Sequence, residues 1–150
     1  MTPREKIEQH FLAFEKIHEG CFEGREDWGA LADFMTPDID YTDPGWGRMH
    51  DRDTVTQFLR DSMKGLEDWD FPMRWYAIEG DHVIKKYSMT LKFNDTDYDI
   101  SGVYMMHYAG DGKFDWIEDQ LNMTHFMTVM RNSGWQPGPG FIAPRNLNWD

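Results

Sequence analysis

The chain has 150 residues, of which 40% are hydrophobic and 15% aromatic, so it is long enough to bury a core as a single domain. Its formal net charge of −12 disfavours binding to nucleic-acid phosphate or to an anionic membrane surface. The single cysteine, Cys21, excludes an internal disulfide, and the lack of a long apolar run or a signal-peptide core predicts a cytoplasmic protein.

Two helices are predicted at the N-terminal end of the chain. A capping box at residues 2–5 is followed by apolar residues at helical spacing, which predicts a helix over residues 3–19. The next group of apolar residues at helical spacing predicts a second helix over about 26–35. Both helices would place one apolar face against the rest of the domain.

The segment that follows, residues 40–47, combines the end of a short strand with a rigid turn. Pro44 restricts Asp43 to extended backbone, and glycines on both sides of Trp46 allow a sharp turn. A carboxylate fixed beside an aromatic side chain suits an acid/base site. Asp, Pro and Gly also favour ordinary turns, so the residues alone leave both interpretations of Asp43 open.

A third helix, four strands and a last helix follow. Asp51 caps the third helix, which ends at Gly65. Alternating apolar residues, separated by polar or glycine-rich turns, then predict antiparallel strands. These strands span residues 73–79, 82–93, 98–108 and 113–121. The last helix is predicted over about 124–132, before an irregular tail.

This order of elements predicts an α+β fold. We expect a cone-shaped barrel, made of a strongly curved, mostly antiparallel sheet wrapped around the N-terminal helices. The surplus aromatic side chains would line a cavity on the concave face of that sheet. Residues 1–134 are predicted to form the domain, and residues 135–150 a tail that packs on the domain or on a partner subunit, because its side chains are too apolar for water.

The element order, the Asp43-Pro44 turn and the Gly-Asp-Gly-Lys hairpin at residues 110–113 resemble the nuclear-transport-factor-2-like superfamily. Within it, the chain looks most like the SnoaL-like and ketosteroid-isomerase-like enzymes. The resemblance covers about residues 3–125 and implies the cone-shaped fold. It implies no single reaction, because the superfamily hosts isomerases, cyclases, epoxide hydrolases, dehydratases and binding modules.

The resemblance also assigns roles to three residues. Asp43 matches the base of ketosteroid isomerases, and Tyr104 matches the donor on a later strand that holds the enolate oxygen. The donor on the first helix of those enzymes is missing, since the matching position is apolar here. Asp119 matches the acid/base residue of SnoaL-like cyclases. Residues 85–89 lack the Arg-x-Asp pair of the epoxide hydrolases, which disfavours that reaction.

Asp43 and Asp119 are expected to project into one cavity from different strands. Burial and like-charge repulsion would then raise the pKa of at least one carboxyl toward neutrality, as a proton shuttle next to a carbonyl requires. Tyr104 or Tyr41 would donate a hydrogen bond to the resulting oxyanion. The side chains expected to bind the ligand are Tyr41, Trp46, Trp75, Tyr87, Met89, Met106 and Ile117.

The leading hypothesis is a cofactor-independent enzyme that isomerises, cyclises or dehydrates a small apolar carbonyl compound by acid/base catalysis. The alternative is a non-catalytic module of the same fold that binds a hydrophobic ligand or a partner protein. No cofactor and no metal site are expected, because the His and acidic residues lack metal-ligand spacing. The resemblance implies a homodimer that pairs through the outer face of the sheet.

Overall fold

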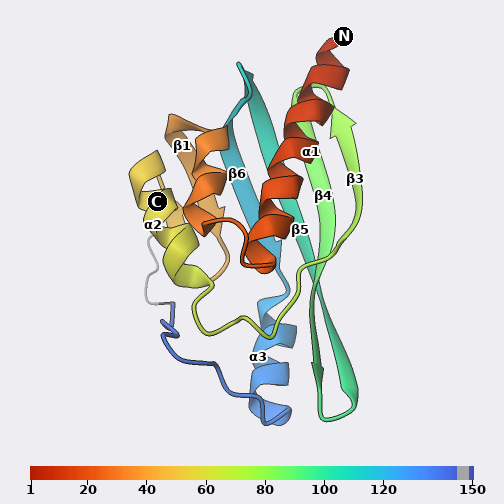
Figure 1. Cartoon of the computed structure of the whole chain (residues 1–150), viewed down its shortest axis with the longest axis vertical. Helices are drawn as coiled ribbons and strands as arrows, with labels where there is room; N and C mark the ends of the chain where they lie inside the picture. Colours follow the sequence, from red (N-terminus) through yellow and green to blue (C-terminus); the bar gives the residue numbers. More distant parts are fainter. Residues whose placement is uncertain (145–148) are drawn as a thin grey trace.

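A six-stranded sheet with the order β2-β1-β6-β5-β4-β3 forms the centre of the computed structural model (Figure 1). The structure describes residues 1–144 and 149–150. The strands are β1 Met35–Asp43, β2 Gly47–Met49, β3 Met73–Glu79, β4 His82–Phe93, β5 Thr96–Gly110 and β6 Lys113–Leu121. The helices are α1 Pro3–Phe22, the 3-10 helix η1 Trp28–Phe34, α2 Arg52–Ser62 and α3 Met123–Asn132.

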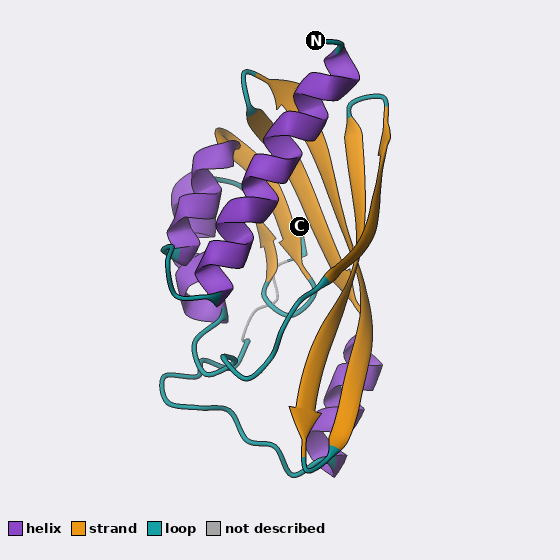
Figure 2. Cartoon of the chain, turned by 45° about the vertical axis from the view of Figure 1, so that its right-hand side comes forward, coloured by secondary structure: helices purple, strands orange, loops and turns teal. Residues whose placement is uncertain are grey.

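The N-terminal helices cover one face of the sheet. Figure 2 shows α1, η1 and α2 packed together on the same side of the curved strands. Neighbouring strands are antiparallel except β1 and β6, which are parallel. The predicted α+β fold, with a curved and mostly antiparallel sheet around N-terminal helices, is confirmed. The sheet is curved but does not close into a barrel.

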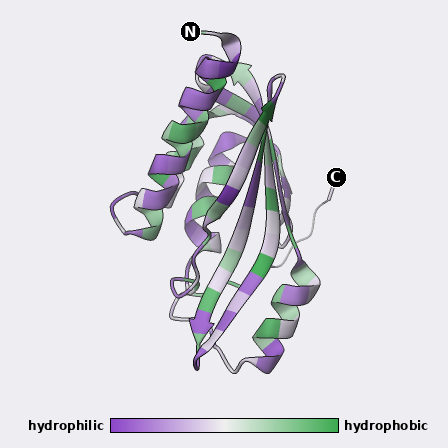
Figure 3. Cartoon of the chain, turned by 90° about the vertical axis from the view of Figure 1, so that its right-hand side faces the viewer, coloured by the Kyte–Doolittle hydropathy of each residue, from purple (hydrophilic) through white to green (hydrophobic). Residues whose placement is uncertain are grey.

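Helix α1 forms because its cap and its apolar spacing agree. The Thr2 hydroxyl accepts a hydrogen bond from the backbone of Glu5, whose carboxylate accepts one from the backbone of Thr2. Ile7, Phe11 and Phe14 are buried on the face toward the sheet. Figure 3 shows hydrophobic and hydrophilic positions alternating along this helix. Neither α1 nor any other helix within the described residues is long and apolar enough to cross a membrane.

The concave side of the molecule holds two hydrophobic clusters. The larger one lies under α1, η1 and α2, and the smaller one lies where the β4–β5 hairpin extends past the other strands beside α3 (Figures 1 and 2). Phe71 and Leu121 pack against both clusters and so mark their junction. The buried members of the smaller cluster are Trp69, Met89, Leu91, Ile100, Val129 and Trp135.

Most element boundaries match the predictions from the sequence. Strands β3, β4 and β6 begin and end at the residues predicted for them, 73–79, 82–93 and 113–121. The predicted helix at 26–35 is a 3-10 helix over Trp28–Phe34, capped by the Asp27 carboxylate, which accepts a hydrogen bond from Gly29. The sequence did not predict β2, because three residues directly after a turn are too few to show alternation.

The described part of the C-terminal tail lies against the domain. Trp135 is buried, and its indole N–H donates a hydrogen bond to the Asp68 carboxylate at 2.9 Å. Phe141 and Trp149 are 37% and 52% exposed. Residues 145–148 of the predicted tail lie outside the described residues.

Candidate active site

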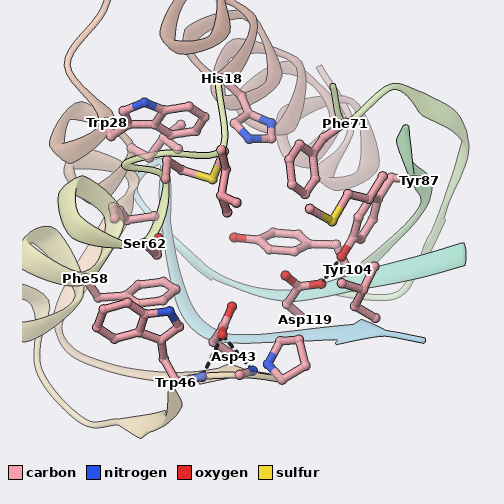
Figure 4. A pocket seen from close by; sticks show the side chains of 18 of the residues that line it. His18, Trp28, Asp43, Trp46, Phe58, Ser62, Phe71, Tyr87, Tyr104 and Asp119 are labelled. Carbon is pink, nitrogen blue, oxygen red and sulfur yellow. Dashed lines mark hydrogen bonds between the residues drawn. The ribbon is translucent and has the colours of Figure 1, made fainter. Parts of the chain in front are cut away.

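A cavity of about 160 Å³ opens on the concave side between the helices and the sheet (Figure 4). Its walls are largely apolar and come from the helices and from the loop before β3. They include Phe14, Phe22, Trp28, Leu31, Phe58 and Phe71. A dry cavity of about 150 Å³ binds benzene in another protein, so a six-membered ring fits here, and the open mouth leaves room for substituents.

The strand register explains why Asp43 and Asp119 meet in this cavity. Strands β1 and β6 are parallel neighbours in which Thr42 pairs with Glu118. Asp43 and Asp119 each follow one residue later, so they occupy adjacent positions on the opposite face from that pair. Figure 4 shows both carboxyl groups directed into the same space.

Asp43 is held in place by its own turn. Its Oδ2 accepts hydrogen bonds from the backbone N–H groups of Gly45 at 2.9 Å and Trp46 at 2.8 Å. These bonds favour the ionised carboxyl, but burial has the larger effect and raises the pKa of Asp43 to about 6. Both interpretations of Asp43 therefore apply, because the residue shapes a turn and also presents a carboxyl to the cavity.

Asp119 accepts a hydrogen bond from the Tyr87 hydroxyl at 2.5 Å. Burial, and then repulsion from Asp43, raise the pKa of Asp119 to about 7, although the Tyr87 hydrogen bond and the charge of Lys85 oppose that rise. Near neutral pH the two carboxyls therefore share a proton, which belongs to the pair rather than to one residue. The two backbone N–H groups at Asp43 favour the arrangement in which Asp119 carries it.

A glycine gives Tyr87 its position beside Asp119. Tyr87 pairs with Gly102 across β4 and β5, and a Cβ atom at Gly102 would lie 2.3 Å from Cζ of the tyrosine ring. The ring thus lies across a position where any side chain would collide with it. Without a side chain at residue 102, the phenol can reach Asp119.

Tyr41 and Tyr104 form a pair of buried hydroxyl groups, with 3.1 Å between their oxygens. Burial raises the pKa of both phenols, so both remain protonated. A hydroxyl that accepts a hydrogen bond keeps its own hydrogen for another acceptor. When Tyr41 donates to Tyr104, the Tyr104 hydroxyl, which points into the cavity in Figure 4, remains free to donate to a ligand.

The cavity brings together seven residues predicted from the sequence: Tyr41, Asp43, Trp46, Tyr87, Met89, Tyr104 and Asp119. Three other predicted ligand-binding positions need correction. Trp75 on the edge strand β3 is 54% exposed, because Tyr76 and Ile78 take the inward positions of that strand. Met106 and Ile117 pair with each other and are buried in the larger cluster, and neither lines the cavity.

The sequence-based predictions missed two polar residues of the cavity wall, His18 and Lys85, and the Glu15 carboxylate that binds Lys85. His18 from α1 and Lys85 from β4 line the cavity. The Lys85 ammonium donates a hydrogen bond to the Glu15 carboxylate at 2.7 Å and lies 4.6 Å from the ring centroid of Tyr104. One signal was present in the sequence, since Lys85 shares the alternation of Tyr87 and so faces the concave side.

The polar groups of the cavity are suited to holding and moving a proton. One carboxyl can accept a proton, its neighbour can supply one, and a tyrosine hydroxyl can stabilise negative charge on an oxygen. Across residues 1–144 and 149–150, no group of three or more His, Cys, Asp or Glu side chains is placed to hold a metal ion.

Comparisons with known proteins agree with this fold. The family model of the SnoaL-like domain matches residues 14–116. A comparison with curated protein sequences finds no significant match.

Solved structures with the same fold include enzymes of several kinds. A putative SnoaL-like polyketide cyclase from Jannaschia sp. CCS1 shares 16% identity at a TM-score of 0.60, covering 83% of this chain and 93% of that one. A steroid delta-isomerase from Pseudomonas aeruginosa shares 17% sequence identity at a TM-score of 0.59, and the match covers 83% of this chain and 89% of the isomerase. SalBIII is an epoxide hydrolase/cyclase-like enzyme in pyran ring formation in the polyether salinomycin. It shares 18% sequence identity at a TM-score of 0.63, and the match covers 83% of this chain and 97% of SalBIII. Identities this low show the shared fold alone.

Proposed function

Since the chain belongs to the SnoaL-like domain family, we propose that it is an enzyme that moves a proton on a small, largely apolar carbonyl compound without a cofactor. One observation carries this proposal: two carboxyls with raised pKa values share an apolar cavity with a tyrosine hydroxyl pair. Isomerisation, cyclisation and dehydration can all begin with removal of a proton next to a carbonyl, so the same groups serve each reaction.

Asp43 is the base in this proposal. Its carboxylate, oriented by the backbone N–H groups of Gly45 and Trp46, takes a proton from the carbon beside the carbonyl. The electron pair of the broken C–H bond forms the enolate, whose charge lies on the carbonyl oxygen. Tyr104, supported by Tyr41, donates a hydrogen bond to that oxygen as its charge develops.

Asp119 is the acid. It carries the shared proton near neutral pH, and the Tyr87 hydroxyl orients its carboxyl group. In a dehydration Asp119 gives this proton to the leaving hydroxyl. In a cyclisation the enolate carbon attacks a second carbonyl, and Asp119 protonates the oxygen of that carbonyl. In an isomerisation the proton on Asp43 returns to a different carbon of the same substrate.

The non-catalytic alternative explains the cavity less well. Neither Asp43 nor Asp119 is exposed, and burying two carboxyls beside each other costs free energy. A cavity that merely holds an apolar ligand gains nothing from that cost. The cavity is also open to solvent, so a substrate can reach the acids. Both features support the enzyme over the binding module.

The direct test is proton–deuterium exchange at the carbon next to the carbonyl, measured by NMR in D₂O for a panel of cyclic ketones. We expect exchange with the wild type and a large loss with Asp43→Asn, whereas Asp119→Asn should keep exchange, because Asp119 gives up its proton only after the enolate has formed. Asp115→Asn is the matched control, because Asp115 lies on the same strand as Asp119 and its carboxylate is hydrogen-bonded to the His107 imidazole. Ketones that bind but exchange equally with all four proteins would favour the binding module.

We also propose a homodimer that pairs through the outer face of the sheet. On the edge strand β3, Met73 and Trp75 are 36% and 54% exposed, which leaves apolar surface in water. Sedimentation at micromolar concentration should show the dimer, and a monomer there would contradict this proposal.

A further inference from the structure

Glu15, His18 and Lys85 form a polar subsite that the proton-transfer steps do not use. The side chains of Lys85 and Glu15 are 5% and 12% exposed, and His18 and Lys85 line the cavity. Figure 4 shows His18 across the cavity from Asp43. A ligand whose carbonyl lies at Asp43 therefore has this second group of polar atoms on the other side of the same space.

The ammonium of Lys85 has more donors than the protein uses. It carries three N–H bonds, and within the described residues its one hydrogen-bond acceptor is Glu15, at 2.7 Å. The rings of Tyr104 and Tyr87 lie with their centroids 4.6 Å and 6.0 Å from the nitrogen. A buried ammonium is stabilised by further oxygen acceptors, and a ligand oxygen in the cavity can supply one.

His18 adds a neutral polar group to the subsite. Burial, and then the charge of Lys85, lower the pKa of His18 well below its usual value. Its imidazole packs against the rings of Phe14, Phe22 and Trp28, and the imidazole makes no hydrogen bond with any described residue. One of its ring nitrogens is then a donor and the other an acceptor, and a ligand hydroxyl can use either.

The charges around the subsite favour a neutral ligand group over an anion. Glu15 offsets the charge of Lys85 through their ion pair, and Asp43 and Asp119 share one proton near neutral pH. The cavity as a whole therefore carries excess negative charge. An anionic ligand group would be repelled by these carboxylates, whereas an uncharged oxygen can accept from Lys85 without that cost.

We propose that the polar subsite binds a second, uncharged oxygen of the substrate, a hydroxyl or keto group, while the reacting carbonyl lies at Asp43 and Tyr104. This inference rests on the proposed function and narrows its substrate class. The substrate is a ring ketone with an additional neutral oxygen substituent, and ketones that have an alkyl group or a carboxylate in its place bind more weakly.

The test compares ligands that differ at one substituent. Cyclohexanones bearing hydroxyl, methyl or carboxylate at position 3 or 4 are titrated into the full chain, and binding is followed by NMR of the methionine methyl groups. Met63, Met89 and Met123 line the cavity and report its occupancy. The double variant Lys85→Met with Glu15→Gln removes both charges of the ion pair together, so that neither is left buried alone. Lys86→Met is the control, since Lys86 is the next residue on β4 and its ammonium bonds to a backbone oxygen.

We expect the wild type and Lys86→Met to bind a hydroxy ketone about tenfold more tightly than its methyl counterpart, and the double variant to lose that preference. The carboxylate should bind more weakly than the hydroxyl. The subsite is overturned if the double variant still prefers the hydroxy ketone over the methyl ketone, or if the carboxylate binds most tightly. Either result leaves the proposed function intact, because the ketones still bind. Failure of every ketone to bind the wild type overturns both.

Discussion

Replacing Asp119 with asparagine should make the protein more stable at alkaline pH, although it removes a functional carboxyl. The folded state raises the pKa of Asp119 from 3.8 to about 7. Between these pH values the folded chain binds a proton that the unfolded chain has lost. Folding stability therefore falls as the pH rises from about 4 to about 7, and above that it stays reduced. Asparagine does not titrate, so the variant escapes this loss.

The size of the effect follows from the shift in pKa. A change of about three pKa units, at about 1.36 kcal/mol per unit, amounts to about 4 kcal/mol at pH 8. The interaction with Asp43 spreads part of this over both carboxyls, so we expect a gain of about 2 to 4 kcal/mol. An asparagine oxygen can still accept the Tyr87 hydrogen bond, which keeps the change in packing small.

Urea unfolding followed by tryptophan fluorescence measures this gain. The free energy of unfolding of the wild type and of Asp119→Asn is compared at about pH 4 and about pH 8. The variant should be more stable than the wild type by a larger amount at the higher pH. Asp115→Asn serves as the control on the same strand, because Asp115 is part-exposed and hydrogen-bonded to His107 at 2.6 Å. It should show no gain at pH 8.

A stability difference that does not depend on pH would contradict the raised pKa of Asp119. If Asp119→Asn and the wild type differ by the same amount at both pH values, the Asp119 carboxyl is not held protonated by the fold. Its role as the acid would then lose its physical basis.

Three further predictions concern the same cavity. The exchange rate should rise as the pH passes the Asp43 pKa of about 6, because only the ionised carboxyl can accept the proton, and a rate that does not change there would remove Asp43 from the base role. Tyr104→Phe should lower the exchange rate about 10²- to 10³-fold with little change in ketone affinity, whereas equal losses in both would make Tyr104 a binding residue. Gly102→Ala should destabilise the protein by about 1 to 3 kcal/mol in urea unfolding, because its methyl group collides with Tyr87, while Ser101→Ala, at an exposed position beside it, should have little effect.

The alternation of apolar residues was enough to place the strands and their faces. It located β4 and put Tyr87 and Met89 on the concave side, because side chains of a strand alternate between its faces. It could not show how far along the strands the cavity lies. Met106 and Ile117 share a face with Tyr104 and Asp119, but they lie two residues further along β5 and two residues earlier on β6, where they are buried in the larger cluster.

Two other features depend on contacts between distant parts of the chain. The face of the sheet on which Trp75 lies depends on how β3, an edge strand, pairs with β4. The register of that pairing shifts between Met73 and Trp75. The acceptor of Lys85 is Glu15, which lies 70 residues earlier in the chain. A single sequence shows the charge of Lys85 but not the helix that comes to lie over it.

The junction of the two hydrophobic clusters has a consequence for cooperativity. Phe71 and Leu121 pack against both clusters, and both also line the cavity. A bound ligand touches the same two side chains, so it joins the clusters into one unit that opens together. Amide hydrogen exchange in α3 and at the tip of the β4–β5 hairpin should therefore slow when the cavity is filled. Amide exchange in these two segments, which carry none of the proposed catalytic groups, would thus report whether the cavity is occupied.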